Sequence, residues 1–454
     1  MYHTIAIEDL GKPAVALCHT GFVIDAKSAA AAEGMPGIRL VLEAVPPECS
    51  VPEQVEAGVM AAMDDIVTAL TIPLTAEEAS PKLKKAEKVP RIAFKGSLEE
   101  VNRFFYRRGW GDGLPVVPPT KEAVAEMLAG TDLPPDHVVG KVIPRFGKAT
   151  VEKIAINAVM AGALPTVMPL LMAGIQALAD PATRFLASQS STGSFGPFWI
   201  INGPVRRDLN IDSGAEALTP GDIGSSTFGR AMGLIIKNIG GARKGVEDKG
   251  TLGNPAKYST VLAENEEESP WEPLQVTQGF EKEDSTLTVF FPNAGVQLLT
   301  YGTDVRGILN AIIYNVVPGK KGLCCLVLPP PHARTLHQEG WTKKQVRAFI
   351  SEFARVPAYR HTLYWGGEPE VLAKERMPFG PEDSMRILRH ADWIRVVVAG
   401  GPSNFIGLFT GGGSKFPGEG TGGVDFVTRK VELPSGWAKL VKKYKDVVPA
   451  YQRY

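Results

Sequence analysis

The sequence predicts an α/β protein in which a small parallel α/β N-terminal domain is fused to a larger mixed α/β domain. Over the first 78 residues, short apolar runs alternate with helical segments, an order typical of parallel strands joined by helices. A longer series of the same kind follows, after a Lys-rich, apolar-poor stretch bracketed by prolines. We therefore predict one domain over residues 1–78, a linker over 79–91 and a second domain over 92–454.

The first domain is predicted to contain three short strands and two helices. The strands are Ala14–Cys18, Gly37–Leu42 and Ile66–Ile72, and the helices are Asp25–Glu33 and Val51–Met63. Asp25 is expected to cap the first helix, because a short acidic side chain can accept from the first backbone amides. Gly34 is expected to close that helix.

The second domain is predicted to be mixed α/β. Ser97 followed by Glu100 is a capping-box pattern and marks the start of a helix. Further strands are expected at Pro197–Asn202, Ser285–Phe291, Cys324–Leu328 and Trp393–Ala399. Further helices are expected at Ser226–Asn238, Thr303–Tyr314 and Thr342–Ala354, with a short surface helix in Ser435–Tyr454.

Composition excludes several classes of function. Lys plus Arg equals Asp plus Glu at 49 each, so no charge excess points to nucleic acid or to a membrane surface. Four cysteines in 454 residues do not form a disulfide framework, which favours a reducing, cytoplasmic setting. The first residues lack the pattern of a signal peptide.

One uncharged segment, Ile154–Ala179, is long enough to cross a bilayer. Its prolines, Pro165 and Pro169, favour two buried helices that meet near the first of them, since the residue before a proline avoids the helical region. We expect no membrane span. So long an apolar segment also makes a homo-oligomer plausible.

Cys18 is the sharpest candidate for catalysis. It ends an apolar strand, and in α/β sheets the carboxyl ends of strands face the ligand crevice. A thiol near a helix N-terminus is expected to have a lowered pKa, which favours the reactive thiolate. His19 could assist it, and Thr20 in the following turn could contact a substrate. The alternative is a buried structural cysteine, since free cysteine packs as a small apolar residue.

Two carboxylates and a set of anion-binding candidates lie in the second domain. In AENEEESPWEPL, Glu264 and Glu272 flank an acidic run and are candidates for proton donation, against the alternative of a solvated loop. Small residues around Ser194, together with Arg206 or Arg207, could hold a substrate carboxylate. Lys415 in a glycine-rich loop could bind an anion. Ordinary loops explain both segments equally well.

Other signals are weaker or absent. Asp112 lies between glycines, a position typical of a tight turn. Cys324 and Cys325 lie within a predicted strand, so they should point to opposite faces and at least one should be core. No spacing typical of zinc ligands, of a P-loop or of a dinucleotide fold is present. We therefore assign no cofactor and no metal ligands, although the carboxylates of AENEEESPWEPL could also bind a hard metal ion, and an external thiol or a partner protein would supply any electrons.

The first domain resembles the selenocysteine–Gly–Ser–Cys (UGSC) family and the selenoprotein subunit of component B of the glycine, sarcosine and betaine reductases. The resemblance rests on AVALC, HTGFVIDA, EGMPGIRLVL and VTALTIPLT, and it places Cys18 at the selenocysteine position. It implies that Cys18 is a nucleophile. The second redox residue of that family, three places on, is Gly21 here, so a local dithiol cycle is absent.

The second domain resembles a poorly characterised family that accompanies UGSC proteins. The segments that carry this resemblance are WGDGLPVVPPT, ATVEKIAINAVMAGALP, NGPVRRDLNIDSG and ENEEESPWEPL. That family lends no established reaction, but the resemblance implies that the two domains build one site between them.

The leading hypothesis is a thiol-dependent enzyme, an oxidoreductase or lyase. In it, Cys18 attacks a small carboxylate-bearing organic substrate, with reductive cleavage of a carbon–heteroatom bond favoured. One alternative is a non-redox lyase, hydratase or hydrolase that uses the carboxylates. Another is a non-catalytic subunit of a larger reductase complex, whose cysteines would be unreactive.

Overall fold

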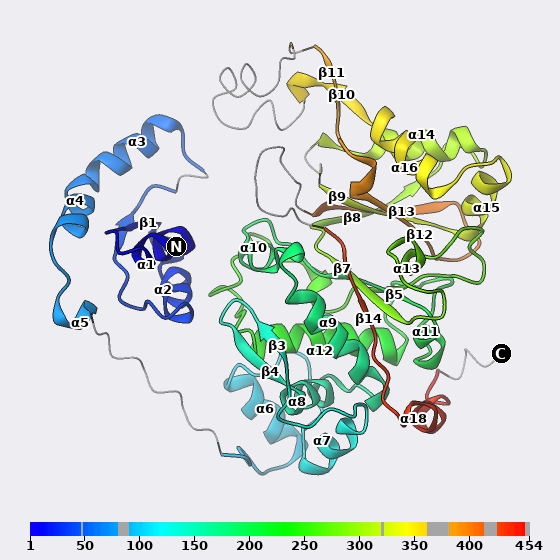
Figure 1. Ribbon diagram of the computed structural model, residues 1–454, viewed down its shortest axis with the longest axis horizontal. Coiled ribbons are helices and arrows are strands. Elements are labelled where there is room, and N and C mark those ends of the chain that lie inside the picture. Colours follow the sequence, from blue (N-terminus) through cyan, green and yellow to red (C-terminus); the bar gives the residue numbers. More distant parts are fainter. Residues whose placement is uncertain are drawn as a thin grey trace.

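The computed structural model describes residues 1–46, 49–79, 90–318, 322–360, 380, 382–412 and 425–449. Figure 1 shows an N-terminal unit, coloured blue, beside a larger unit that holds two four-stranded sheets. The mixed α/β class predicted from the sequence is confirmed. Of the predicted linker, residues 80–89 lie outside the described part of the chain.

The N-terminal unit is built on two parallel strands, β1 (Ala16–His19) and β2 (Leu40–Glu43), with Cys18 paired to Leu42. Its helices are α1 (Tyr2–Asp9), α2 (Val23–Ala32), α3 (Pro52–Ala61), α4 (Met63–Thr71) and α5 (Ala76–Ala79). The two strands and the helix between them are confirmed. Gly34 follows α2 with a φ of 84°, the left-handed conformation that ends a helix.

Two details of the predicted N-terminal unit are wrong. The segment 66–72 belongs mainly to helix α4 and is not a strand. Half-buried Ile66 and Ala69 are three residues apart, a helical period, and Asp64 and Asp65 favour a helix start at this point. Asp25 does not cap α2, because a 3₁₀ turn (Thr20–Phe22) leads directly into the helix and makes Phe22 its first flanking residue.

The larger unit has four layers: helices, sheet, sheet and helices. The first sheet has the strand order β14-β7-β5-β6, and the second has the order β12-β9-β13-β8. Their bounds are β5 (Phe198–Asn202), β6 (Val261–Ala263), β7 (Thr286–Phe290), β8 (Ala294–Leu299), β9 (Leu323–Leu328), β12 (Ile394–Val398), β13 (Phe405–Gly412) and β14 (Val427–Lys430). Small antiparallel pairs are β3 (Val138–Val142) with β4 (Gly147–Thr150), and β10 (Arg355–Pro357) with β11 (Ser384–Arg386).

Helices cover the outer face of each sheet (Figure 1). Those whose residues pack with the first sheet are α7 (Lys121–Leu128), α8 (Val151–Ala161), α9 (Met168–Leu178) and α12 (Ile223–Asn238). Those on the second are α14 (Val305–Asn315), α15 (Pro330–Gln338) and α16 (Lys343–Phe353). The remaining helices are α6 (Leu98–Arg107), α10 (Phe185–Ser190), α11 (Val205–Asp208), α13 (Leu274–Thr277) and α18 (Trp437–Tyr444).

The alternation of side chains along the strands produces the layers. In β5, Phe198 and Ile200 pack between the two sheets, whereas Trp199 packs against the helices. In β9, Cys325 lies between the sheets and Cys324 lies on the outer helical side. Both cysteines are buried, on opposite faces as predicted. Because both faces of these strands are covered, β9 is apolar throughout and β5 is apolar up to its last residue, Asn202, without alternating polar positions.

The uncharged segment 154–179 forms most of α8 and α9, two helices joined by a 3₁₀ turn that begins at Pro165, as predicted. Most of its side chains are buried within the core of this chain. The apolarity of the segment therefore gives no separate argument for an oligomer. Within the described residues, none of the helices combines the length and the apolarity that a membrane span requires.

The two sheets are arranged alike around their central strands. β5 is parallel to β6 and antiparallel to β7, and β9 is parallel to β12 and antiparallel to β13. The ends of β6 and β12 meet, since the backbone amide of Asn265 donates to the carbonyl of Val398 at 2.7 Å. The carboxyl ends of both parallel pairs therefore approach each other inside the larger unit.

Candidate functional site

Cys18 lies next to the last residue of β1, at the carboxyl end of the parallel pair. Its side chain is 8% exposed, and the sulfur lies 3.4 Å from the carbonyl oxygen of His19. The strand-end position predicted from the sequence is therefore where the thiol is found. Such an end is where α/β sheets usually bind ligands.

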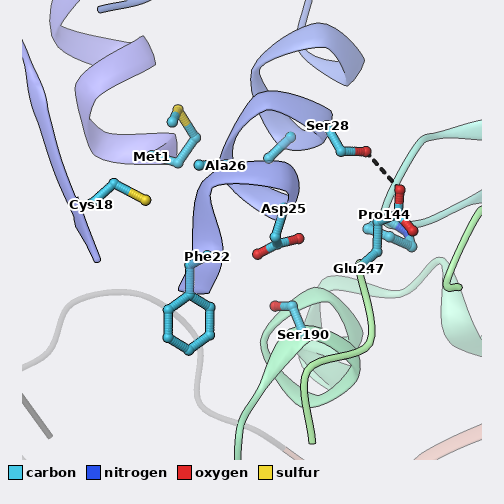
Figure 2. A pocket seen from close by; sticks show the side chains of 10 residues that line it. Met1, Cys18, Phe22, Asp25, Ala26, Ser28, Pro144, Ser190 and Glu247 are labelled. Carbon is cyan, nitrogen blue, oxygen red and sulfur yellow. Dashed lines mark hydrogen bonds between the residues drawn. The ribbon is translucent and has the colours of Figure 1, made fainter. Parts of the chain in front are cut away.

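The thiol borders a cavity of about 190 Å³ that both units line. Figure 2 shows the Cys18 sulfur pointing into the space between α1, α2 and the larger unit. The lining residues from the N-terminal unit are Met1, Cys18, Phe22, Asp25, Ala26, Ser28 and Ala29, and those from the larger unit are Pro144, Ser190 and Glu247. The cavity has room for a small organic molecule and contains two carboxylates.

Glu247 holds the two units together at one side of this cavity. It is 1% exposed and accepts a 2.8 Å hydrogen bond from the hydroxyl of Ser28, shown in Figure 2. Arg243 donates to the same carboxylate at 2.9 Å through its Nε. Burial opposes ionisation of Glu247, but these hydrogen bonds outweigh it and hold its pKa below the ordinary value. Glu247 is therefore a fixed, charged group.

A second contact joins the units near the turn after β1. Lys249 donates from its Nζ to the carbonyl oxygen of Gly21 at 3.0 Å, and it lies 5.8 Å from the centre of the Phe22 ring. An ammonium group at this distance from an aromatic ring is attracted to its face. Lys249 thus contributes positive charge beside the cavity without being one of its lining residues.

Burial raises the pKa of Cys18 above its ordinary value, the N-terminal amino group opposes that rise and Asp25 adds to it. The lowered pKa expected from the nearby helix N-terminus is therefore wrong for this arrangement. Desolvation disfavours the thiolate more than the start of α2 favours it. At neutral pH the thiol is protonated. Nucleophilic attack by Cys18 therefore needs a group that accepts the proton, or a bound substrate that makes the buried thiolate easier to form.

Asp25 lies in the first turn of α2, and its carboxylate points into the cavity between Phe22 and Ser190 (Figure 2). Burial and then the charge of Glu247 raise the pKa of Asp25 to about 6, while Lys249 and the N-terminal amino group act in the opposite direction. Asp25 is therefore a carboxyl that changes protonation state close to neutral pH. Sequence reasoning assigned it to helix capping and missed it as a site residue.

His19 and Thr20 do not line the cavity. Successive side chains of a strand point to opposite faces, so His19 lies on the other side of β1 from Cys18. Its Nδ1 accepts from the backbone amide of Gly21 at 3.2 Å, which caps the 3₁₀ turn. Thr20 is exposed in that turn. The arrangement gives His19 a local structural role.

Glu264 and Arg206 belong to a separate buried network, where β6 and β12 meet. Glu264 is fully buried and accepts from Asn202 at 2.7 Å, from the amide of Leu274 at 2.7 Å and from Lys343 at 3.0 Å. Arg206 is 3% exposed; it donates to the carbonyl of Glu264 and forms ion pairs with two further glutamates, Glu266 and Glu267. These partners occupy both groups within the larger unit.

The other predicted residues are scattered. Arg207 is mostly exposed and lies 3.4 Å from Glu267, and Glu272 is exposed. Ser194 has a φ of 57° and accepts from the amide of Gly253 at 3.1 Å, so its hydroxyl shapes a loop. Lys415 lies outside the described residues. None of the residues Ser194, Arg206, Arg207 and Glu272, all of which the structure describes, lines the Cys18 cavity.

Asp112 occupies the predicted turn and accepts from the amide of Leu114 at 3.2 Å. Its carboxylate also forms an ion pair with Arg230 of α12 at 2.8 Å. This pair ties the loop 110–115 to the helical layer, which is a structural role.

None of the other described cysteines lines the Cys18 cavity. All four are free, and only Cys49 is exposed. Burial raises the pKa of Cys324 to about 12 and that of Cys325 well above its ordinary value. These two thiols are core groups. Among the residues that the structure describes, no group of three or more His, Cys, Asp or Glu side chains is arranged to hold a metal ion.

Of the residues of the larger unit that complete the cavity, Ser190 belongs to the small-residue segment around Ser194 that was expected to bind an anion, although Ser194 itself was the residue chosen there, and Glu247 was missed. Glu247 carries no motif, and both residues are far from Cys18 in the chain. In the sequence, Arg243 and Glu247 are four residues apart, which is the spacing of an ordinary ion pair on a helix. This spacing therefore gives no indication of a functional site.

The comparisons with known proteins bear on the N-terminal unit alone. No curated protein and no solved structure matches the chain significantly. The resemblances to a reductase subunit and to a family accompanying UGSC proteins therefore stay predictions. The UGSC family model matches residues 1–72, so the unit that carries Cys18 is similar to the UGSC family.

Proposed function

We propose that the protein is a thiol-dependent enzyme in which Cys18 attacks a small organic substrate and cleaves a carbon–heteroatom bond. The observation that supports this most is the shared cavity: the Cys18 sulfur faces about 190 Å³ of space that residues of both units enclose. A merely structural cysteine needs no such space beside it. The UGSC similarity of residues 1–72 supports a role for the same residue.

The proposed first step forms a thioether. The sulfur displaces a nitrogen, sulfur or halogen leaving group X from carbon, so that Cys18–SH and R–X give Cys18–S–R and H–X. Two external thiols then reduce the adduct: they give R–H and free Cys18–SH and are themselves joined as a disulfide. The reductant is placed outside the chain because Gly21 stands at the second redox position, Cys324 and Cys325 are fully buried, and Cys49 does not line the cavity.

The charged side chains that line the cavity change the class of substrate that we expect. Asp25 and Glu247 are the charged side chains among the described lining residues, and both are acidic. The arginines expected to hold a substrate carboxylate lie in another network. A carboxylate-bearing substrate would therefore be repelled by these two side chains, opposed only by the amino group of Met1 and by Lys249, so a neutral or cationic molecule is the easier occupant.

The experiment is adduct trapping. Purified protein is incubated with two- to four-carbon halides, amines and sulfonium compounds, and the Cys18 peptide is weighed by mass spectrometry beside the exposed reference thiol Cys49. We expect a stoichiometric adduct on Cys18, one equivalent of released H–X, and regeneration of the thiol by dithiothreitol with formation of R–H. The Cys18→Ser variant should form neither adduct nor R–H. A native Cys18 that forms no adduct with any of these compounds contradicts the proposal.

A non-redox lyase or hydrolase is the second candidate, because two carboxylates line the same cavity. In that case Asp25 would act on the substrate directly and Cys18 would only pack against it. Turnover that survives in the Cys18→Ser variant, and that is lost in Asp25→Asn, would favour this candidate. The remaining hypothesis, a non-catalytic subunit, predicts an inert Cys18 together with co-purification of a partner.

A further inference from the structure

We propose that Asp25 is the proton acceptor and donor for Cys18, and that Glu247 positions and tunes it for that role. This inference rests on the proposed function and adds the residue that moves the proton. It is built on the two carboxylates that share the cavity with the thiol.

The two carboxylates differ in how many partners they have. Both oxygens of Glu247 are engaged, one by Ser28 and the other by Arg243, and Arg145 lies 3.8 Å away. Asp25 makes no hydrogen bond or ion pair with any residue that the structure describes, and its oxygens face the cavity. A proton carrier must be free to gain and lose hydrogen bonds, so Asp25 is suited to that task and Glu247 is not.

The groups around Asp25 set its protonation. Glu247 faces it from the larger unit, Lys249 lies nearby in the same segment, and Cys18 and the N-terminal amino group approach from β1 and α1. Burial and the charge of Glu247 bring the pKa of Asp25 to about 6, the range in which a carboxyl both accepts and returns a proton at neutral pH. An exposed aspartate with a value of ~3.9 would hold almost no proton there.

The proton balance of the thioether step needs such a group. The thiol of Cys18 is protonated at rest, because burial raises its pKa. As the sulfur attacks carbon, its proton passes to the Asp25 carboxylate, and Asp25 then protonates the departing group X. The net change is Cys18–SH plus R–X to Cys18–S–R plus H–X, with Asp25 returned to its starting state.

The test separates proton acceptance from adduct formation, with iodoacetamide as the probe. The alkylation rate of Cys18 in the full chain is measured from pH 4.5 to 10 by peptide mass spectrometry. For the wild type we expect a first rise with a midpoint near 6, when Asp25 ionises, and a second rise at high pH, when the thiolate forms. Asp25→Asn should lose the first rise and react about 100-fold more slowly at pH 7, the lower end of the usual effect of such a group.

Two further variants make the result specific. Glu247→Gln removes the charge that raises the pKa of Asp25, so the first rise should move to lower pH without disappearing. Asp9→Asn, an exposed substitution of the same kind in α1, should leave the profile unchanged. A first rise that persists in Asp25→Asn, or that does not move in Glu247→Gln, overturns the inference. A wild-type Cys18 that does not react in the native state contradicts the proposed function itself.

Discussion

At the scale of single residues, the site is defined by what burial does to two ionisable groups. Burial raises the pKa of Cys18 and, with Glu247, brings that of Asp25 to about 6. The fold therefore disfavours the charged form of both residues. Such pKa shifts cluster at functional sites, but burial alone produces them in core thiols such as Cys324, so the shared cavity is what distinguishes Cys18 and Asp25.

Asp25 makes the stability of the protein depend on pH with a definite sign. Its pKa is raised in the folded state, so the stabilisation is complete below ~3.9, the unfolded value, and is lost as the pH rises through about 6. Asp25→Asn should therefore be more stable than the wild type at pH 7.5, by about 1 kcal/mol once solvent screening of a half-buried group is allowed for. Near pH 4 the two proteins should unfold alike.

Urea unfolding at both pH values measures this difference, with Asp9→Asn as the matched control. An Asp25→Asn protein that differs from the wild type by the same amount at pH 4 and at pH 7.5 would show that packing, and not ionisation, is responsible.

The sequence could reveal Cys18 but not its neighbours. A cysteine that ends an apolar run before a turn carries a local signal, and the structure places it at a strand end. Asp25 has an equally local alternative explanation, since an acidic residue near a helix start is common. Glu247 becomes part of the site only through the docking of Ser28, a contact between distant parts of the chain.

At the scale of secondary-structure elements, close approaches between helices and loops depend on small residues. In α12, a methyl group added at Gly229 would lie 2.7 Å from the Cα of Ser259, whereas one at Gly174 in α9 would lie 3.2 Å from the flexible end of Met232. Backbone cannot move away as a methionine tip can.

Gly229→Ala should therefore destabilise the larger unit by about 1–3 kcal/mol, the usual cost of overpacking. Gly174→Ala, its matched control, should change stability by less, because alanine also favours the helix. Thermal and urea unfolding of the two variants give the comparison. Equal effects of the two substitutions would contradict this account of the contact at Ser259.

Four of the eight strands in the two main sheets were predicted from the sequence, whereas β6, β8, β13 and β14 were not. The strands β5, β7, β9 and β12 begin and end within a residue of the predicted bounds, because buried strands are continuous apolar runs bounded by polar or turn residues. Helix α4 was not predictable in this way. Its β-branched residues favour a strand, and only tertiary contacts of one helical face decide between the two.

At the scale of the whole molecule, the Glu264 network joins the two sheets. Glu264 binds Lys343 of α16 and approaches the backbone of Val398 in β12, so it links the parallel pairs of both sheets. This placement accounts for its burial without any catalytic role. The contact between the two sheets at Glu264 depends on how strands from distant parts of the chain pair. Local sequence patterns do not specify that pairing.

Glu264→Ala should destabilise the protein by about 3–5 kcal/mol, since it leaves Lys343 without its partner in a buried site. Glu272→Ala, at an exposed position of the same segment, should change stability by no more than about 0.5 kcal/mol. Urea unfolding measures both. A Glu264→Ala protein of normal stability that has lost activity would return Glu264 to the list of catalytic candidates.

The two units meet at the Cys18 cavity, and we propose that this cavity gives small molecules access to the thiol. Time-resolved iodoacetamide labelling of the native protein at pH 9, with each cysteine peptide followed by mass spectrometry, tests it most directly. Exposed Cys49 should react first, Cys18 should follow within the same experiment, and the core residues Cys324 and Cys325 should stay unlabelled until the protein unfolds. A Cys18 that stays as inert as Cys324 and Cys325 would contradict the account.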